Sequence, residues 1–490
     1  MVQYDAAIIG AGADGLAAAA ALAGADLKVV VLERAERCGG RLATCEFHPG
    51  FRASPFQDEL APIPAEIFWA LDLARRGAVF VPTPSSLALW PDRRDVLPPR
   101  LQTEVAERRL LGDASARRAS VLARAMADAN TPPARSWFQR RSESAPWNGE
   151  DWAARSLAEL LAETQLPADR CAHLMVSLLG GRSADPSLAG SVLQLLAPRN
   201  SGVVMGGLAT LAGALEAAAR EAGAEITCGL DVSDIRQEKR RVAGVCLADG
   251  TEIAARAVIS TLDLKRTFLT LFAWNDLPLG AAKRASNFRQ AAGTARLLLA
   301  LEAPPPVDAA LTRGAIHVSP DTEALAEAHA ACRAGTIAER LPLTLRLVSA
   351  SDPGLAPGGK AVMTVTAGCI PYHLFDGPWT HDKRKALSDR AMAQIEAIWP
   401  GVASRVVAAE LIVPPDIEEA LGLSEGDLDG GEMAPDQMLR FRPFAECSGG
   451  RTPVEGLYLA GPSSTAGPLA TCASGIVAAR AVLTDLGRSA

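Results

Sequence analysis

The stretch AAIIGAGADG, residues 6–15, decides the fold of this chain. Four apolar residues are followed at once by glycines with the spacing GxGxxG, and an alanine-rich segment, residues 16–25, comes next. A second apolar run, residues 28–32, ends at the acidic residue Glu33. This order of strand, glycine-rich turn, helix, strand and acid predicts a βαβ unit that binds a dinucleotide.

Each part of this unit has a physical role in holding a pyrophosphate. Gly10 permits a tight turn after the strand, Gly12 leaves room for phosphate beside the backbone, and Gly15 lets the helix pack close to the strand. The helix begins near Ala13 and Asp14, where unpaired N–H groups and the positive end of the helix dipole favour an anion. We therefore expect all five residues at the cofactor.

The acidic residue and the segment after it extend the predicted cofactor site. Glu33 lies eighteen residues after Gly15, where a carboxylate can accept hydrogen bonds from both ribose hydroxyls. Its charge disfavours the 2′-phosphate of NADP, although the adjacent Arg34 weakens that argument. The glycine pair that ends at Gly40 permits a second backbone approach, and Arg41 can neutralise phosphate with a forked contact.

The segment from Gly10 to Thr44 resembles the FAD site of the phytoene-desaturase and amine-oxidase group of flavoproteins. In that group the acid, the Gly-Gly-Arg triplet and a following threonine occur in this order. The resemblance implies FAD rather than NAD. It also implies an α/β fold, in which a Rossmann-type FAD-binding domain with a parallel sheet, helices and a β-meander is interleaved with a mixed-sheet α+β substrate domain.

Composition excludes several other classes of protein. The chain has 490 residues and a net charge of -7, which argues against a dedicated nucleic-acid binder. Its nine cysteines include no CxxC pair and no His/Cys cluster with zinc spacing, so we expect no metal site. The chain starts without a signal peptide and contains no apolar run near the roughly 20 residues that span a bilayer. These features predict a cytoplasmic protein with free thiols.

An arginine-rich region lies in the first third of the chain. Residues 101–129 have apolar positions at helical spacing, and residues 93–141 hold eleven Arg, no Lys and five Asp or Glu. A solvated helix face accounts for this pattern best. A peripheral membrane contact or an anionic-ligand patch is the alternative.

Periodicity and turn signals divide the chain into interleaved parts. Residues 242–247 and 252–257 predict a hairpin, and residues 258–261 predict a strand that returns to the cofactor domain. We assign residues 1–60, 200–263 and 440–490 to the FAD-binding domain. Residues 61–199 and 264–439 form the substrate domain, with a helical subregion near residues 100–180. The resemblance also places the backbone of Val232 against the adenine.

The C-terminal end of the chain predicts the second half of the cofactor site. An apolar strand closes on Gly461, and after a loop of small residues a helix is expected to start near Ala470 and Thr471. A helix N-terminus again favours an anion. In the family this helix points at the pyrimidine edge of the flavin, which assigns Gly461, Leu469, Ala470 and Thr471 to the cofactor. Cys472 is expected to be a small packed residue, with a reactive thiol or a covalent flavin link as the alternative.

Two further segments narrow the resemblance. Residues 371–374 and 377–379, and later residues 431–437, resemble the branch of pyridine-nucleotide-disulfide-oxidoreductase-domain-2-like proteins. Tyr372 and His373 are the candidates for the substrate pocket or proton handling, against the alternative of a packed pair at a strand end. Residues 53–55 depart from the Asp-Gly that desaturase-like proteins carry near the flavin ring.

The predicted function is that of an FAD-dependent oxidoreductase. It would dehydrogenate, or desaturate, a largely apolar small molecule by hydride transfer to the flavin, which requires orientation and exclusion of water but no nucleophile. An amine or amino-acid oxidase that produces an imine is the closest alternative. A flavin-dependent isomerase and a flavin-bound scaffold without turnover remain further alternatives.

Overall fold

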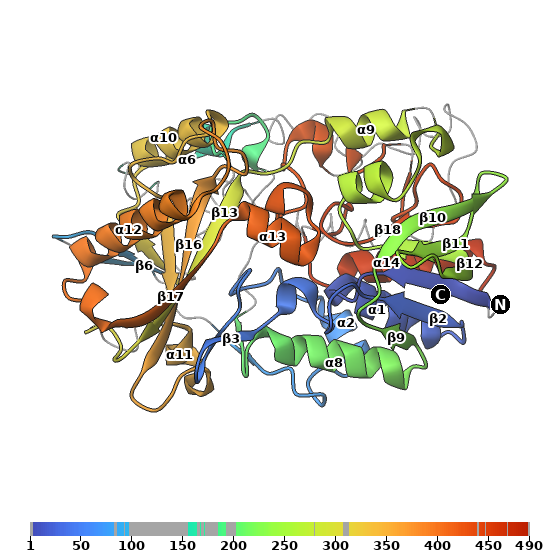
Figure 1. The fold of residues 1–490 in the computed structure, drawn as a ribbon, viewed down its shortest axis with the longest axis horizontal. Helices are drawn as coiled ribbons and strands as arrows, with labels where there is room; N and C mark the ends of the chain where they lie inside the picture. The colour runs from blue at the N-terminus through green and yellow to red at the C-terminus, as the bar shows by residue number, and fades with distance from the viewer. Residues whose placement is uncertain are drawn as a thin grey trace.

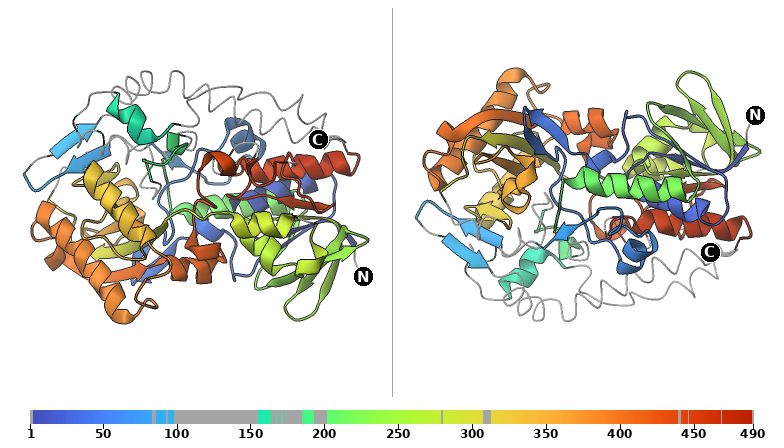
Figure 2. Two further views of the ribbon diagram at one scale, coloured as in Figure 1. Left: turned by 90° about the horizontal axis from the view of Figure 1, so that it is seen from above. Right: turned by 90° about the horizontal axis from the view of Figure 1, so that it is seen from below.

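The computed structural model describes residues 3–82, 86–92, 94–97, 155–163, 167, 171, 185–192, 202–278, 280–306, 313–438, 441–445, 447–467 and 469–488. Two seven-stranded sheets lie at opposite ends of the molecule, as Figures 1 and 2 show. The predicted arginine-rich helix at residues 101–129 lies outside the described residues, and so does most of the helical subregion near residues 100–180.

The first sheet is built from both ends and the middle of the chain. Its strands, in spatial order, are β10 (Val232–Glu238), β11 (Arg241–Leu247), β12 (Glu252–Ser260), β1 (Gln3–Ile9), β2 (Val29–Leu32) and β9 (Glu225–Thr227), with β18 (Leu457–Leu459) paired to β12. The pairs β12–β1, β1–β2, β2–β9 and β12–β18 are parallel, whereas β10, β11 and β12 form an antiparallel meander. This confirms the Rossmann-type sheet and the meander. Residues 252–257 and 258–261, expected as two elements, form a single strand apart from the last residue.

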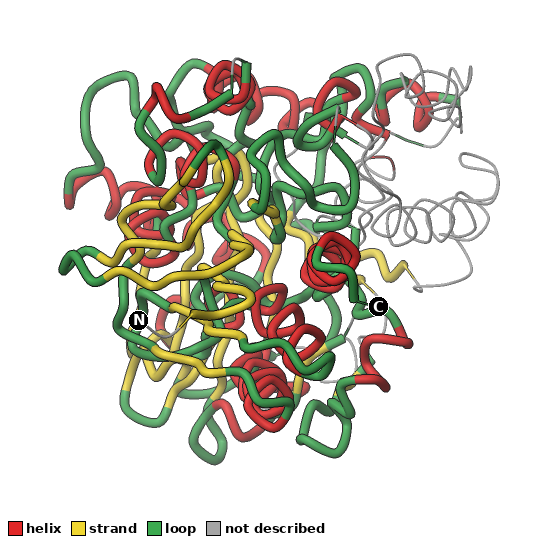
Figure 3. Tube along the Cα trace, turned by 90° about the vertical axis from the view of Figure 1, so that its right-hand side faces the viewer, coloured by secondary structure: helices red, strands yellow, loops and turns green. Residues whose placement is uncertain are grey.

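Helices rich in small residues pack beside this sheet, and Figure 3 shows helices alongside strands in a view from this end of the molecule. They are α1 (Ala13–Ala23), α8 (Leu208–Glu221) and α14 (Ala473–Asp485), whose buried residues share one core with the sheet. A Cβ built on Gly475 would lie 1.9 Å from the backbone oxygen of Asp14, and one on Gly15 would lie 2.1 Å from that of Gly10. The absence of side chains at these positions lets the two helix starts and the first turn approach one another at the cofactor-facing edge.

The second sheet is mixed, as predicted. Its order is β17 (Val406–Ile412), β13 (Gly293–Leu301), β16 (Ala361–Ile370), β15 (Leu343–Arg346), β14 (Ile316–Val318), β6 (Ser86–Leu89) and β7 (Arg94–Leu97). Among these described strands, β14 and β6 form the parallel pair and the others pair antiparallel. One face is apolar and forms a core with α12 (His381–Ile398).

The opposite face of the second sheet carries polar side chains among apolar ones such as Leu298 and Val362. Because side chains alternate along a strand, Arg296 of β13 lies on the same face as its register partner Thr366 of β16. Thr364 is paired with Arg346 of β15 in the same way. Strand β15 ends at Arg346, and the short helix α11 (Val348–Ser351) follows it.

Smaller elements connect the two sheets. These are the hairpin β3 (Cys45–His48) and β4 (Phe51–Ala53), the pair β5 (Phe80–Val81) and β8 (Val203–Val204), and the helices α2 (Ala65–Ala70), α6 (Leu157–Ala162), α9 (Ala281–Asn287), α10 (Thr322–Arg333) and α13 (Pro414–Leu421). Over the described residues, no helix has the length and apolar character needed to cross a membrane. The domain boundaries given above stay a prediction.

Candidate functional site

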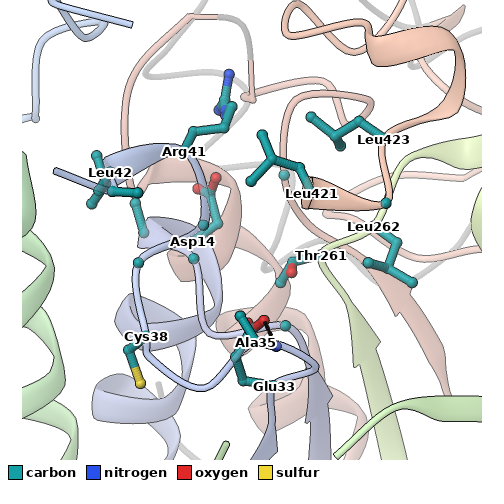
Figure 4. A pocket seen from close by; sticks show the side chains of 18 of the residues that line it. Asp14, Glu33, Ala35, Cys38, Arg41, Leu42, Thr261, Leu262, Leu421 and Leu423 are labelled. Atoms are coloured by element: carbon teal, nitrogen blue, oxygen red, sulfur yellow. Dashed lines mark hydrogen bonds between the residues drawn. The ribbon is translucent and has the colours of Figure 1, made fainter. Parts of the chain in front are cut away.

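An open cavity of about 470 Å³ extends from the first βαβ unit to the loop that precedes α14. Its wall comes from the β1–α1 turn and from residues 32–44, 56–57, 60–61, 230–232, 261–262, 266, 420–423, 428–429, 461–462, 467 and 471. The two ends of the chain therefore meet at one cavity, together with the segment that follows β4. Figure 4 shows the loop after β2 facing Leu421 and Leu423 across it.

The phosphate end of the cavity is shaped by glycine. Gly12 precedes the first residue of α1, and a Cβ built on it would meet no heavy atom of the described residues within 4 Å. The open space beside this backbone is what a pyrophosphate needs. Gly40, with φ +54, lies opposite, and Arg41 lines the cavity while its Nη1 donates to the Leu428 carbonyl at 2.6 Å. Gly10, Gly12, Ala13, Gly40 and Arg41 all line the cavity.

Asp14 and Gly15 hold the start of α1 in place beside the elements that it packs against. Burial raises the pKa of the Asp14 carboxyl, while hydrogen bonding to Ser474 and the charge of Arg41 oppose that shift. The Gly475 backbone N–H donates to Asp14 Oδ1 at 3.3 Å, which ties the starts of α1 and α14 together. Asp14 is part of the cavity wall, whereas Gly15 is not and serves the close packing described above.

Glu33 and its neighbour have different partners. Glu33 Oε2 accepts a hydrogen bond from Ala11 N at 2.6 Å and Oε1 accepts one from Ala35 N at 2.9 Å, the second of which is drawn in Figure 4. The carboxylate is therefore held at the cavity wall in one orientation. Arg34 also lines the cavity, but its Nη2 donates to the Glu419 and Ala420 carbonyls at 2.7 and 3.0 Å. Arg34 thus links the first unit to the C-terminal end of α13.

The adenine end predicted at Val232 is also part of the cavity. Val232 begins β10 and lines the wall beside Leu262 and Thr261. Arg266, which we did not predict, lines the same region. It lies in a turn of helix after β12, and no sequence motif marks it.

The C-terminal loop forms the opposite end of the cavity. Gly461, with φ +83, and Thr471 line the wall, and Thr471 Oγ1 donates to the Ala61 carbonyl at 2.6 Å. Leu469 and Ala470 are buried in the core and are absent from the wall. Residues 470 and 471 were expected to begin the last helix, but α14 starts at residue 473, because the preceding residue has φ +67 and interrupts the helical backbone.

Cys472 is that preceding residue, and it is fully buried. Burial, together with the nearby Asp14 charge, raises the pKa of its thiol well above the usual value. The thiol therefore stays protonated and packs in the core, which is the interpretation we favoured over a reactive thiol. It is not part of the cavity wall.

The catalytic candidates Tyr372 and His373 are not brought to this cavity. The Tyr372 hydroxyl donates to the Glu418 carboxylate of α13, and this hydrogen bond raises the tyrosine pKa to about 12. His373 is exposed and stacks edge-on against Tyr372, with ring centroids 4.6 Å apart. The two residues form a packed pair at the end of β16, which was the alternative interpretation.

The segment after β4 holds residues that we did not predict. Phe56, Gln57, Leu60 and Ala61 line the cavity. The departure from the desaturase pattern at residues 53–55 pointed to this region but not to these side chains.

Two buried ion pairs fix this segment to the polar face of the second sheet. Arg296 Nη1 and Nη2 lie 2.8 and 2.7 Å from the two carboxylate oxygens of Asp58, and Thr364 Oγ1 donates to the same carboxylate at 2.9 Å. Arg346 Nη2 lies 2.6 Å from Glu59 Oε1. The partners are more than two hundred residues apart in the chain, so no local sequence pattern could reveal them.

The arrangement defines a class of protein. The residues fit a flavin dinucleotide, because an open glycine-lined phosphate end, an oriented acid and a second small-residue loop share one cavity. The family model "Flavin containing amine oxidoreductase" matches residues 156–483, and an NAD(P)-binding Rossmann-like domain matches residues 8–75. The chain belongs to the flavin containing amine oxidoreductase family.

Individual relatives refine this placement. A rat protein, pyridine nucleotide-disulfide oxidoreductase domain-containing protein 2 from Rattus norvegicus, is 28% identical over 99% of this chain and 94% of its own length. A limonene dehydrogenase polypeptide from Castellaniella defragrans is 26% identical over 99% of this chain and 95% of its own length. The structure of cyclohexylamine oxidase from Brevibacterium oxydans superposes with a TM-score of 0.60 at 16% identity, over 99% of this chain and 100% of that one, which shows a shared fold.

The chain is therefore a flavin-dependent oxidoreductase. A bound flavin supplies an acceptor for a hydride or electrons at its ring. The residues that would hold it are Gly12 and Arg41 for a pyrophosphate and Glu33 for a ribose, while the segment after β4 and the loop before α14 supply the remaining wall. In the described residues no group of three or more His, Cys, Asp or Glu side chains could hold a metal ion.

Proposed function

We propose that this protein binds FAD and dehydrogenates a largely apolar small molecule by transfer of a hydride to the flavin. The observation that carries the proposal is the single cavity that runs from the oriented carboxylate of Glu33 to Thr471 and Phe56. A cofactor that occupies its whole length needs an adenosine half at one end and a ring at the other. FAD meets that requirement within a flavin family.

The character of the ring end supports an apolar substrate. Phe56, Leu60 and Ala61 form the wall there, and the two acidic residues between them are both paired with arginine. No carboxylate of residues 56–61 is thus available for a substrate cation. An apolar wall favours orientation of a hydrocarbon by packing alone and excludes water from the reacting atoms.

The positions of the tyrosines also support an apolar substrate rather than an amine. The chain has three, all of them among the described residues, and none lines the cavity. An aromatic cage that holds an amine beside a flavin would need several aromatic side chains at this wall, where Phe56 is the one that the described residues supply. The likeness over nearly the full length to a limonene dehydrogenase polypeptide, named for a hydrocarbon substrate, supports oxidation of a C–C bond.

The deciding experiment is anaerobic reduction of the bound flavin. The purified protein would be mixed with limonene or with cyclohexylamine, and bleaching of the visible flavin band would be followed by stopped flow. We expect bleaching with the hydrocarbon, no bleaching with the amine and no ammonia on readmission of oxygen. Rapid bleaching by the amine with release of ammonia would instead establish an amine oxidase.

An isomerase would turn over without lasting change in the flavin spectrum, and a scaffold would show no bleaching with any compound. The cytoplasmic location and the possible peripheral membrane contact stay predictions, since the arginine-rich region lies almost entirely outside the described residues.

A further inference from the structure

Gln57 is a polar side chain inside the apolar end of the cavity. It is only 6% exposed and belongs to the cavity wall. Its side-chain amide makes no hydrogen bond to any residue that the structure describes, and neither amide atom is among the fully buried polar atoms that lack a partner. The amide is therefore turned toward the cavity, where it offers an unused donor and an unused acceptor.

The segment that follows Gln57 is anchored by several contacts. The next two residues, Asp58 and Glu59, form the buried ion pairs with Arg296 and Arg346. The side chains of Asp58 and Arg296 are 7% and 2% exposed, so breaking this pair would leave a buried charge. Further along, Thr471 binds the Ala61 carbonyl. A buried amide on so constrained a segment is suited to a fixed ligand rather than to water.

The position of Gln57 selects the ligand. Gln57 lies on the segment that Thr471 joins to the loop before α14, whereas Glu33 follows β2 in the first βαβ unit. With FAD bound along the cavity, this end receives the ring. The polar edge of the flavin ring carries carbonyl oxygens next to an N–H, so it needs a donor and an acceptor side by side. An amide supplies both, whereas a carboxylate or a guanidinium supplies one kind.

We propose that Gln57 hydrogen-bonds to the polar edge of the flavin ring and that the Asp58–Arg296 pair positions it for that contact. This rests on the proposed binding of FAD. The consequence is that the second sheet, through Arg296 of β13, sets the environment of the ring. Substrate domain and flavin are thereby joined by one short chain of contacts.

The test compares Gln57→Leu and Gln57→Glu with the natural protein. FAD is removed, and its dissociation constant, visible spectrum and reduction potential are measured on reconstitution. Gln57→Leu removes a neutral hydrogen bond, so it should weaken FAD binding up to about tenfold and shift the flavin band. Gln57→Glu adds a negative charge beside the ring and should disfavour the reduced flavin about tenfold, which lowers the potential by about 30 mV.

Controls separate this contact from general damage. Gln237 of β10 donates to the Asp276 carbonyl at 3.2 Å outside the cavity, and Gln237→Leu should leave spectrum, potential and affinity unchanged. Gln57→Asn keeps an amide and should bind FAD more tightly than Gln57→Leu does. It provides a second comparison with the natural protein if Gln57→Leu folds poorly. Arg296→Lys should shift the flavin band in the same direction as Gln57→Leu, and the double variant should show no additional shift.

The outcomes are distinct. The inference would be overturned if Gln57→Leu and Gln57→Glu both kept the FAD dissociation constant within about twofold of the natural protein's and left the spectrum and the potential unchanged. A changed KM in these variants would then assign Gln57 to the substrate instead. Additive effects of Arg296→Lys and Gln57→Leu would overturn the positioning role. Failure of the natural protein to take up FAD would refute the proposed function and this inference together, whereas normal uptake with indifferent variants would refute the inference alone.

Discussion

The two glycines Gly12 and Gly15 provide a matched pair of substitutions with opposite expected effects. Both belong to the same GxGxxG turn, and alanine adds the same methyl group to each. A Cβ on Gly12 would meet no atom of the described residues within 4 Å, whereas one on Gly15 would lie 2.1 Å from the Gly10 carbonyl oxygen and 3.2 Å from Thr261 Cγ2. We therefore expect Gly12→Ala to impair cofactor binding and Gly15→Ala to impair folding.

The magnitudes follow from the local backbone. Gly12 has φ -76, which any residue adopts, so alanine there should change the free energy of unfolding without cofactor by less than about 1 kcal/mol. The added methyl occupies space that the pyrophosphate needs, and overpacking of about 1–3 kcal/mol corresponds to an FAD affinity roughly 5- to 150-fold lower. At Gly15 the overlap is with rigid backbone, so a loss of stability of about 3 kcal/mol or more is expected.

The assay uses protein stripped of flavin. Denaturant unfolding without FAD reports stability, and quenching of FAD fluorescence on titration reports affinity. The reasoning is wrong if Gly12→Ala binds FAD as tightly as the natural protein, or if Gly15→Ala is as stable as the natural protein without FAD. A marked loss of stability in Gly12→Ala without FAD would also contradict the open space that the structure shows beside this residue.

Three further changes test other parts of the structure. Arg296→Met should lower the free energy of unfolding by about 3–5 kcal/mol in denaturant titrations because it leaves the Asp58 carboxylate buried without its partner, and Asp58→Asn in the same chain should recover part of that loss. Cys472 should resist iodoacetamide at about pH 8 in the native protein and react once the protein is unfolded, because burial raises its thiol pKa; labelling of native protein measured by mass spectrometry would contradict this. Burial raises the pKa of Asp427 to about 6 from 3.8, so the folded state holds its proton more tightly than the unfolded state does. The contribution of this carboxyl to the free energy of unfolding is fully present below its unfolded pKa and is lost as pH rises through about 6. Asp427→Asn should therefore flatten the dependence of the free energy of unfolding on pH between about pH 4 and 6.

Local sequence patterns were sufficient to predict the fold of the cofactor half of the molecule. The strand, turn, helix and acid in residues 6–33 follow one another without interruption, so their periodicity and spacing predict both the fold and the phosphate end. The hairpin at residues 242–257 was equally legible, because alternation and an Asp-Gly turn act over a few residues. The last helix was misplaced by three residues because a positive φ at Cys472 has no signature in a non-glycine residue.

The ring end of the cavity could not be predicted in the same way. Tyr372 and His373 were chosen from a resemblance in sequence, and the structure shows that Tyr372 bonds to α13, that His373 is exposed, and that neither lines the cavity. Asp58 and Arg296 gave no signal, since a lone acid after a hairpin and a lone arginine in a strand each suggest an exposed side chain. Their burial arises because β13 pairs with β16 and presents Arg296 to a segment 238 residues earlier in the chain.

The order of residues thus determined the type of fold, the class of cofactor and the phosphate-binding turn, since these depend on interactions over a few dozen residues. Folding in three dimensions settled which side chains line the cavity beside the loop before α14. It is the tertiary structure that puts Gln57 in the cavity wall and pairs Arg296 with the adjacent Asp58, while Tyr372 lies outside the wall. The difference lies in contact range: glycine spacing and strand periodicity are local properties, whereas a buried ion pair exists only after two sheets from distant parts of the chain have packed around one cavity.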